Sequence, residues 1–196
     1  MSSVKIEGSA RERLLAAANE LFYAEGVHSV GIDRVIERAG VAKASLYSSF
    51  GSKEELVRAY LASRAERRQQ RISDRLARET DARAKMLAVY EVLGELATQP
   101  EYRGCAFVNA SAESPRGQSK VTAVCASSRG WLRSLFTSLA REAGAPDAET
   151  LAGQLVLLYD GAVISASMDH DPTATERARA TAAILLDAAL PKRRKA

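Results

Sequence analysis

Residues 31–56 read GIDRVIERAGVAKASLYSSFGSKEEL, which is the most informative stretch of the chain. Its first part repeats apolar residues at helical spacing, which predicts a helix with one apolar face: Ile32, Val35, Ile36 and Ala39. Gly40 comes next, where the end of a helix needs a left-handed residue. After a three-residue turn we expect a second short helix, which packs back onto the first through Val41, Leu46 and Phe50.

The outward face of this second helix carries short, polar or basic side chains: Lys43, Ala44, Tyr47 and Ser48. A short helix with an apolar inner face and a small, cationic outer face can lie in the major groove of DNA. The stretch therefore predicts a DNA-binding helix-turn-helix.

The same stretch resembles the helix-turn-helix signature of the tetracycline-repressor (TetR) family of bacterial regulators. The resemblance rests on Ala39-Gly40-Val41, Leu46-Tyr47, Phe50 and Ser52-Lys53-Glu54-Glu55-Leu56, and it extends from Arg11 to about Leu61, roughly the first quarter of the chain. It implies an all-α homodimer whose N-terminal three-helix domain binds DNA. It also implies C-terminal helices that bind a small effector and dimerise.

Individual side chains of this region are candidates for DNA contacts. Lys43 lies near the N-terminal end of the second helix, where it can donate to a base edge or a phosphate. Lys53 opens the next helix, where free backbone N–H groups and the helix dipole favour an anion. Tyr47 is expected to send its hydroxyl to a phosphate. The predicted DNA-binding set is Gly31, Lys43, Ala44, Ser45, Tyr47, Ser48 and Lys53.

Two of these positions depart from the family pattern. Gly31 stands where many relatives have a Ser or Thr that caps the helix and touches a phosphate. Ser48 stands where a His or a larger residue is common. The operator sequence therefore does not follow from these residues.

Composition and charge fit a DNA-binding, globular chain. The 196 residues are 46% hydrophobic and 27% charged, no apolar run is long enough for a membrane span, and the start of the chain does not resemble a signal peptide. We therefore expect a cytoplasmic protein. Residues 1–72 hold 12 Lys or Arg and 9 Asp or Glu, whereas residues 73–191 hold 12 and 15. A basic front part favours contact with a polyanion at that end.

Residues for catalysis or metal binding are few. Cys105 and Cys125 give no metal spacing and no disulfide framework, so buried or semi-buried thiols are favoured over a redox switch. Neither His28 nor His170 has a Cys or carboxylate at metal-ligand spacing. We predict no catalytic residue, no metal site and no cofactor, and hence no enzyme.

The pattern along the chain predicts about nine helices and an all-α fold. We expect a DNA-binding domain over 1–51, a connecting helix over 52–80, an effector-binding and dimerisation domain over 81–191 and a basic tail over 192–196. The charged stretch 64–78 favours a solvated connector over a second DNA contact. Residues 104–113 are expected to form a short helix, although their propensity also fits a strand. The tail is most simply a solvated end, with extra DNA affinity as the alternative.

The last two predicted helices carry apolar stripes that favour a dimer. The stripes comprise Leu151, Leu155, Leu158 and Ala162, and Ala178, Ala182, Leu185 and Ala189. A dimeric four-helix bundle is favoured over packing within one chain, because a symmetric operator is bound by a symmetric dimer.

A mainly apolar effector is expected to bind among Tyr90, Phe107, Asn109, Trp131, Tyr159 and Asp160. For each aromatic residue, a place in the core is the competing interpretation. Asp160 lies in the most apolar stretch of the chain, so it needs a partner, either across the dimer seam or on a ligand. The predicted function is a ligand-responsive transcriptional regulator, most simply a repressor. An architectural DNA-binding protein, or an activator without small-molecule control, is the alternative.

Overall fold

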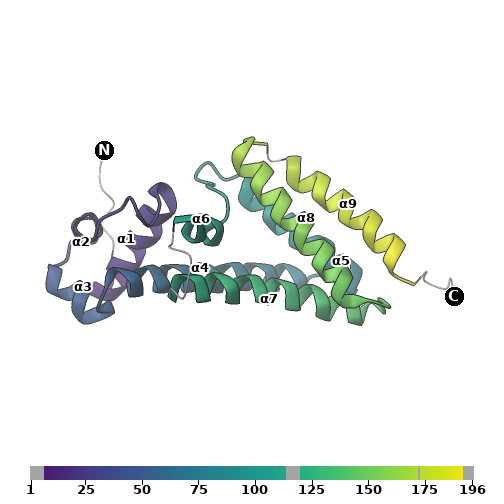
Figure 1. Ribbon diagram of the computed structural model, residues 1–196, viewed down its shortest axis with the longest axis horizontal. Coiled ribbons are helices and arrows are strands. Elements are labelled where there is room, and N and C mark those ends of the chain that lie inside the picture. The colour runs from purple at the N-terminus through teal and green to yellow at the C-terminus, as the bar shows by residue number, and fades with distance from the viewer. Residues whose placement is uncertain (1–6, 114–119, 172, 192–196) are drawn as a thin grey trace. The chain divides into compact units, whose positions relative to one another are not determined.

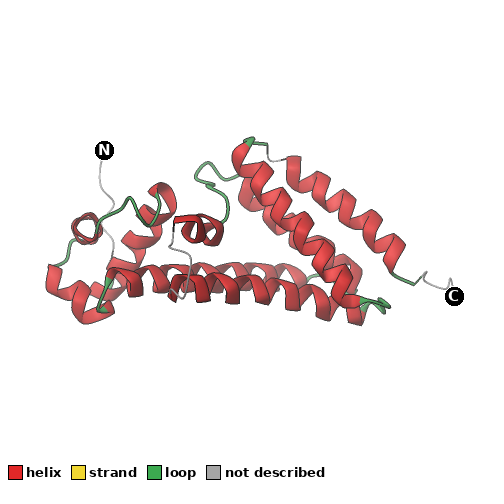
Figure 2. Cartoon of the chain, in the orientation of Figure 1, coloured by secondary structure: helices red, strands yellow, loops and turns green. Residues whose placement is uncertain are grey.

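The computed structural model describes residues 7–113, 120–171 and 173–191. Within these ranges the chain forms nine helices and no strand (Figure 2), which confirms the all-α fold class. The helices are α1 (Ala10–Glu25), α2 (Ile32–Ala39), α3 (Lys43–Phe50), α4 (Lys53–Leu76), α5 (Ala82–Ala97), α6 (Ala106–Glu113), α7 (Lys120–Glu142), α8 (Ala148–Met168) and α9 (Thr173–Ala189). Residues 104–113 thus contain the short helix that we expected. The basic tail lies outside the described residues.

The helices divide into two compact units, each described separately below. The first unit comprises residues 1–66 and 106–126, and the second comprises residues 67–105 and 127–196. The division falls inside α4 and inside α7, and it assigns α6 to the same unit as the helix-turn-helix. The domain boundaries expected from sequence, at residues 51 and 80, differ from those of the compact units. They describe functional regions of the chain, and as such they stay a prediction.

The first unit is built around α1. Its N-terminus has the predicted capping box, in which the Ser9 hydroxyl accepts from the Glu12 N–H and the Glu12 carboxylate accepts from the Ser9 N–H at 2.8 Å. α2 and α3 both pack on α1, and the three lie together at the purple-to-blue end of the ribbon (Figure 1). The buried face of α1 and the start of α4 complete this small core, with Phe22 edge-on to Tyr60 at 5.6 Å between ring centres.

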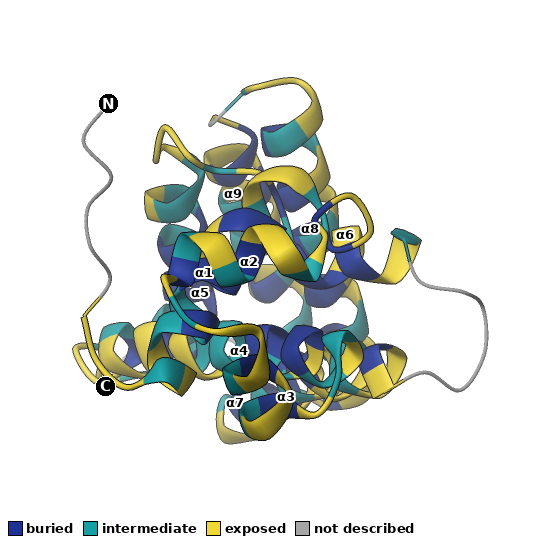
Figure 3. Cartoon of the chain, turned by 90° about the vertical axis from the view of Figure 1, so that its left-hand side faces the viewer, coloured by how far each residue is buried: buried dark blue, intermediate teal, exposed yellow. Residues whose placement is uncertain are grey.

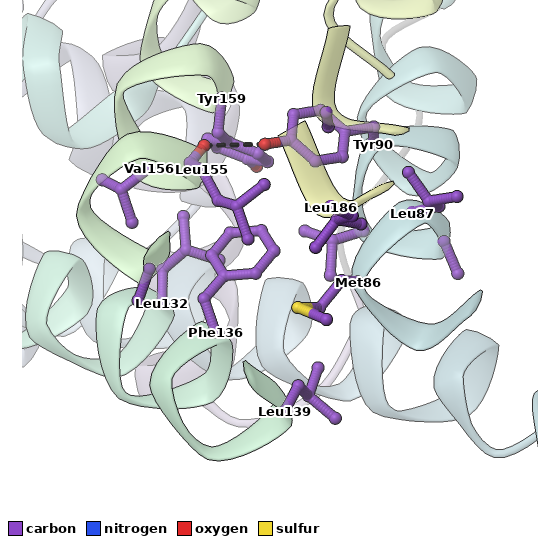
Figure 4. Close-up of a cluster of buried hydrophobic side chains, with 14 of the residues drawn as sticks. Met86, Leu87, Tyr90, Leu132, Phe136, Leu139, Leu155, Val156, Tyr159 and Leu186 are labelled. Carbon is purple, nitrogen blue, oxygen red and sulfur yellow. Dashed lines mark hydrogen bonds between the residues drawn. The ribbon is translucent and has the colours of Figure 1, made fainter. Parts of the chain in front are cut away.

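The core of the second unit lies between α5, α7, α8 and α9. α9 packs against both α5 and α8. Figure 4 shows the centre of this cluster, where the Tyr90 hydroxyl donates to the Leu155 carbonyl oxygen at 2.7 Å. Tyr90, Phe136 and Leu155 are all fully buried. This hydrogen bond satisfies a polar atom that burial would otherwise penalise, so it fixes α5 against α8.

The charged half of α4 is less solvated than its composition predicts. Ile72 and Leu76 join the core of the second unit. Arg75 is half-buried, and its guanidinium binds both Glu79 and Glu91. Two apolar residues thus dock this part of α4 on the core, and the charged side chain between them forms ion pairs with neighbouring glutamates. The role of the stretch as a connector between domains stays a prediction.

One described helix, α8, is long and apolar enough by length and composition to cross a membrane. Its buried face contacts α5 and α9 through residues such as Leu151, Leu155 and Val156. A helix buried in the core of a protein passes the same test of length and composition.

Candidate nucleic-acid interface

The turn between α2 and α3 has the predicted geometry. Gly40 has φ 62° and ψ 43°, which is the left-handed conformation that glycine adopts without steric cost. Its N–H donates to the Glu37 carbonyl at 3.1 Å, and its own carbonyl accepts from the Arg13 guanidinium at 3.2 Å. The turn is thus held from both sides, by α2 and by α1.

The two faces of α3 differ as the sequence predicts. Leu46 and Phe50 are buried in the first unit, with the Arg11 guanidinium 4.8 Å from the centre of the Phe50 ring. Figure 3 shows the alternation of buried and exposed ribbon on α2 and α3. The residues that we expected to point outward are all exposed: Lys43, Ala44, Tyr47 and Ser48. Their orientation is confirmed, whereas their contacts with DNA stay a prediction.

Side chains on the exposed face of α3 form an ion pair and a hydrogen bond within the helix-turn-helix. Lys43 is the first residue of the helix, and its ammonium forms an ion pair with Asp33 of α2 at 3.0 Å. The hydrogen bond from Lys43 to Asp33 raises the pKa of the lysine, so it stays charged. Ser48 donates its hydroxyl to the Ser45 carbonyl at 3.2 Å, and Ser45 is half-buried.

The remaining two candidate residues lie at helix N-termini. Gly31 is the exposed N-cap of α2, and Lys53 is the first residue of α4. Next to Lys53, the Ser52 hydroxyl accepts from the Glu55 N–H at 3.2 Å. Free N–H groups at these two termini are suited to phosphate.

Replacing Gly31 with serine should stabilise the fold. Gly31 has φ −74° and ψ 156°, and a Cβ added there meets nothing within 4 Å. A serine would fit this conformation and cap α2, so we expect the free energy of unfolding to rise by about 0.5–1 kcal/mol. Urea denaturation measures this change. A Gly31→Ala variant, which lacks the capping hydroxyl, is the control, and equal stability of the two variants would contradict the capping argument.

The structure adds contacts that the sequence pattern did not reveal. α2 is tied to α1 by two ion pairs, Arg34 with Glu25 at 2.5 Å and Arg38 with Glu20 at 2.7 Å. The loop between α1 and α2 is held by α6, because the His28 N–H donates to the Glu113 carboxylate at 2.7 Å. These contacts join residues 9, 18 and 85 positions apart, which belong to different elements, so no helical periodicity signals them.

Comparison with known families supports the same assignment. Residues 14–60 match a family of bacterial regulatory proteins, the tetR family. Residues 82–182, which are more than half of the chain, match the tetracyclin repressor-like C-terminal domain. The chain belongs to the TetR family. It is therefore a transcriptional regulator that binds DNA through its helix-turn-helix.

Individual relatives of this TetR-family regulator agree. A TetR-family transcriptional regulator from Streptomyces coelicolor is 33% identical, with a TM-score of 0.85 over 92% of this chain and 95% of that one. The transcriptional activator FasR of Mycolicibacterium smegmatis is 38% identical over 81 residues, which are 41% of this chain and 37% of FasR. The regulator SrpR of Pseudomonas putida is 41% identical over 28% of this chain and 25% of its own length. The chain thus spans well under half the length of these two curated relatives. Escherichia coli NemR in its reduced form, 23% identical with a TM-score of 0.80, shows the shared fold alone.

The predicted effector residues of the regulator are distributed over both compact units. Tyr90, Trp131, Tyr159 and Asp160 belong to the second unit, whereas Phe107 and Asn109 belong to the first. Tyr90 and Tyr159 are buried, Trp131 is half-buried and Asn109 is exposed. In the first unit the Phe107 carbonyl accepts from the Cys125 thiol at 3.4 Å. One shared site for these six residues stays a prediction.

Asp160 has a partner within the chain. Its carboxylate forms an ion pair with Arg129 of α7, and a third of the Asp160 side chain remains exposed. Asp160 is thus paired within its own chain. The partner, Arg129, is neither a residue across a dimer seam nor a ligand, which were the two possibilities considered from sequence. A role for Asp160 toward an effector stays a prediction.

Two open grooves of the second unit differ from the predicted effector site. One, of about 840 Å³, is lined by the start of α5 and the ends of α7 and α9. The other, of about 630 Å³, runs between α5 and the start of α9. Tyr90 lines the second groove, and the other predicted residues line neither.

The buried tyrosines predict a loss of stability in alkali. Burial raises the pKa of Tyr159 to about 12, and burial also raises the pKa of Tyr90. Because an unfolded tyrosine titrates near pH 10, stability is complete below about pH 10. It falls as pH rises toward 12, since the unfolded chain then binds fewer protons than the folded one.

Urea unfolding between pH 8 and 11.5 measures this effect. Each buried tyrosine adds up to about 1.4 kcal/mol of lost stability per pH unit within that window. A Tyr159→Phe variant removes one of the two groups, so its stability should fall less steeply with pH. Equal slopes for the variant and the wild type would contradict this cause.

The predicted dimer residues are largely used by the chain's own core. Five of them are buried within the second unit: Leu151, Leu155, Ala162, Ala178 and Ala182. Leu158, Leu185 and Ala189 are partly buried against that core. These five residues therefore present little surface to a partner, and their place in a dimer interface stays a prediction. Helical periodicity shows an apolar stripe but not what covers it.

Proposed function

We propose that this TetR-family regulator is a homodimeric repressor that a small, mainly apolar effector releases from a pseudo-palindromic operator. The observation that carries the proposal is the exposed face of α3, which presents a lysine, a tyrosine and small side chains on a helix whose other face is buried. Two such helices, one turn of DNA or about 34 Å apart, would enter successive major grooves.

The dimer would form through the faces of α8 and α9 that the core leaves uncovered. Leu157, Ile164 and Met168 follow one another on one side of α8 and are 69%, 41% and 73% exposed. Ile184 of α9 is 72% exposed. Large apolar side chains gathered on neighbouring helices favour burial against a partner. Because α8 and α9 pack side by side in each chain, two chains would form a four-helix seam.

The effector site would lie in the second unit near Trp131 and Tyr159. The Arg68 guanidinium lies 5.9 Å from the centre of the Trp131 ring and donates to the Ser128 carbonyl and hydroxyl at 2.8 and 2.9 Å. Aromatic walls with a few fixed polar groups are typical of small-molecule sites. The match of residues 82–182 to the C-terminal domain of tetracyclin repressor-like proteins supports this placement.

An activator is the second candidate, because FasR, which is similar over 81 residues, is named a transcriptional activator. In vitro transcription from a promoter that carries the bound sequence distinguishes the two. A repressor lowers transcript yield, and an activator raises it. We further propose that the protein acts in the cytoplasm, where bacterial DNA lies, and that it is not an enzyme.

A fluorescence experiment tests the effector part of the proposal. Trp131 is the single tryptophan of the chain, so its emission reports binding nearby. In a screen of apolar small molecules, a compound that changes this emission should also weaken operator binding, with a coupling free energy of roughly 1–3 kcal/mol. A Trp131→Ala variant that still releases DNA fully with that compound would rule out the site. Compounds that bind but leave DNA affinity unchanged would favour an architectural protein.

A further inference from the structure

Lys43 and Asp33 form an ion pair on the exposed surface that is proposed to face DNA. The ammonium and carboxylate are 3.0 Å apart, and the side chains are 58% and 80% exposed. The pair joins the two helices of the helix-turn-helix, since Asp33 lies in the first turn of α2 and Lys43 opens α3. An ion pair with this exposure adds little to the stability of the fold. Stability therefore does not explain why the pair is present.

The N-terminus of a helix is an unfavourable place for a cation. The partial positive charge of the helix dipole repels an ammonium there, and nearby anions offset that repulsion. In the free protein Asp33 supplies the anion. When the protein binds DNA, a phosphate or the acceptor atoms of a base edge can also partner the Lys43 ammonium. Asp33 and the DNA phosphates therefore compete for Lys43.

An ammonium has three N–H donors. Lys43 can therefore keep one hydrogen bond to Asp33 while it donates the others to a base edge in the major groove. A phosphate is an anion, whereas a base edge is neutral. The Asp33 carboxylate therefore repels a phosphate that approaches Lys43 but tolerates a base acceptor there.

We propose that Asp33 is a specificity-determining residue, which holds Lys43 for base contact and disfavours its binding to phosphates of non-cognate DNA. This inference rests on the proposed function of α3 in the major groove. We expect no base contact from Asp33 itself, which acts through Lys43 as a positioning residue.

The test uses Asp33→Asn in the full-length protein. The probes are the tightest duplex that the wild type selects from a random-sequence pool and a random-sequence duplex of equal length. Fluorescence anisotropy over a series of salt concentrations gives both affinities. We expect Asp33→Asn to raise affinity for the random duplex roughly fivefold. The slope of log affinity against log salt should steepen by about one per subunit, because each freed lysine gains a phosphate. The preference for the selected duplex should fall.

Two controls separate this effect from net charge. Glu20→Gln breaks the ion pair with Arg38 between α1 and α2 and changes net charge by the same amount, so it should leave the preference unchanged. Asp33→Asn in a Lys43→Ala background should have no effect beyond that of Lys43→Ala. A gain in random-DNA affinity that persists without Lys43, or that Glu20→Gln reproduces, would overturn the proposal. A wild type that selects no duplex would instead overturn the proposed operator function, and this inference with it.

Discussion

A regulator with glutamate at both Leu157 and Ile184 should be a monomer with at least about 100-fold weaker operator binding. The two residues are the most exposed large apolar side chains at the middle of α8 and near the end of α9. In the proposed seam each would be buried against the partner, where an unpaired carboxylate is strongly disfavoured. Without the seam, each monomer binds a half-site independently. The gain in operator affinity of roughly 10²–10⁴ that comes from linking two binding modules is then lost.

Because both side chains are exposed in the single chain, the substitutions should leave its fold intact. Light scattering on a chromatography column measures the mass, circular dichroism reports the helices, and anisotropy reports operator affinity. Ser138→Glu, at an exposed position of α7, introduces a carboxylate away from the proposed seam and serves as the control. A double variant that remains a dimer with normal operator affinity would show that the seam lies elsewhere.

Lys43→Ala and Lys53→Ala should affect DNA binding in different ways. Lys53, with Tyr47, is assigned to phosphates, so Lys53→Ala and Tyr47→Phe should weaken binding to all sequences by similar factors. Lys43 is assigned to a base edge. Its replacement should cost about 1–3 kcal/mol on the operator and relax the base preference at one position per half-site.

Binding measured on a set of duplexes with single base changes distinguishes these roles. The two lysines differ in position and not in charge, so each variant is the matched control of the other. If Lys43→Ala lowers affinity for the operator and for random DNA by the same factor, its base-reading role is wrong.

The helix-turn-helix could be predicted from sequence because its determinants are local. Gly40 ends α2 where the apolar spacing stops, and Leu46 and Phe50 alternate with the exposed residues of α3 at helical spacing. Each of these features lies within one or two turns of helix. Local propensity and periodicity therefore sufficed for the orientation of the candidate DNA-binding residues.

The partners of charged residues could not be predicted from sequence. A charged side chain can pair with any residue of opposite charge, whether that residue is near or far along the chain. Asp160 meets Arg129, which lies on a different helix, and Glu113 meets the His28 N–H across 85 positions of sequence. Apolar stripes have the same limit. Leu155 and Ala182 are completely covered by their own chain, whereas Leu157 and Ile184 are not, although all four lie on apolar helices. Only the packing of α5, α8 and α9 decides which side of a helix remains uncovered.

Selection of duplexes from a random-sequence pool tests whether the regulator binds a pseudo-palindromic operator as a dimer. We predict that the wild type selects DNA with two half-sites related by a dyad, with centres about 10–10.5 base pairs or one multiple of that apart, as expected for paired α3 helices. The selected duplex should bind one dimer, with an affinity that falls steeply as salt rises. Selected sequences without a dyad, or a stable monomer on the selected duplex, would contradict the account.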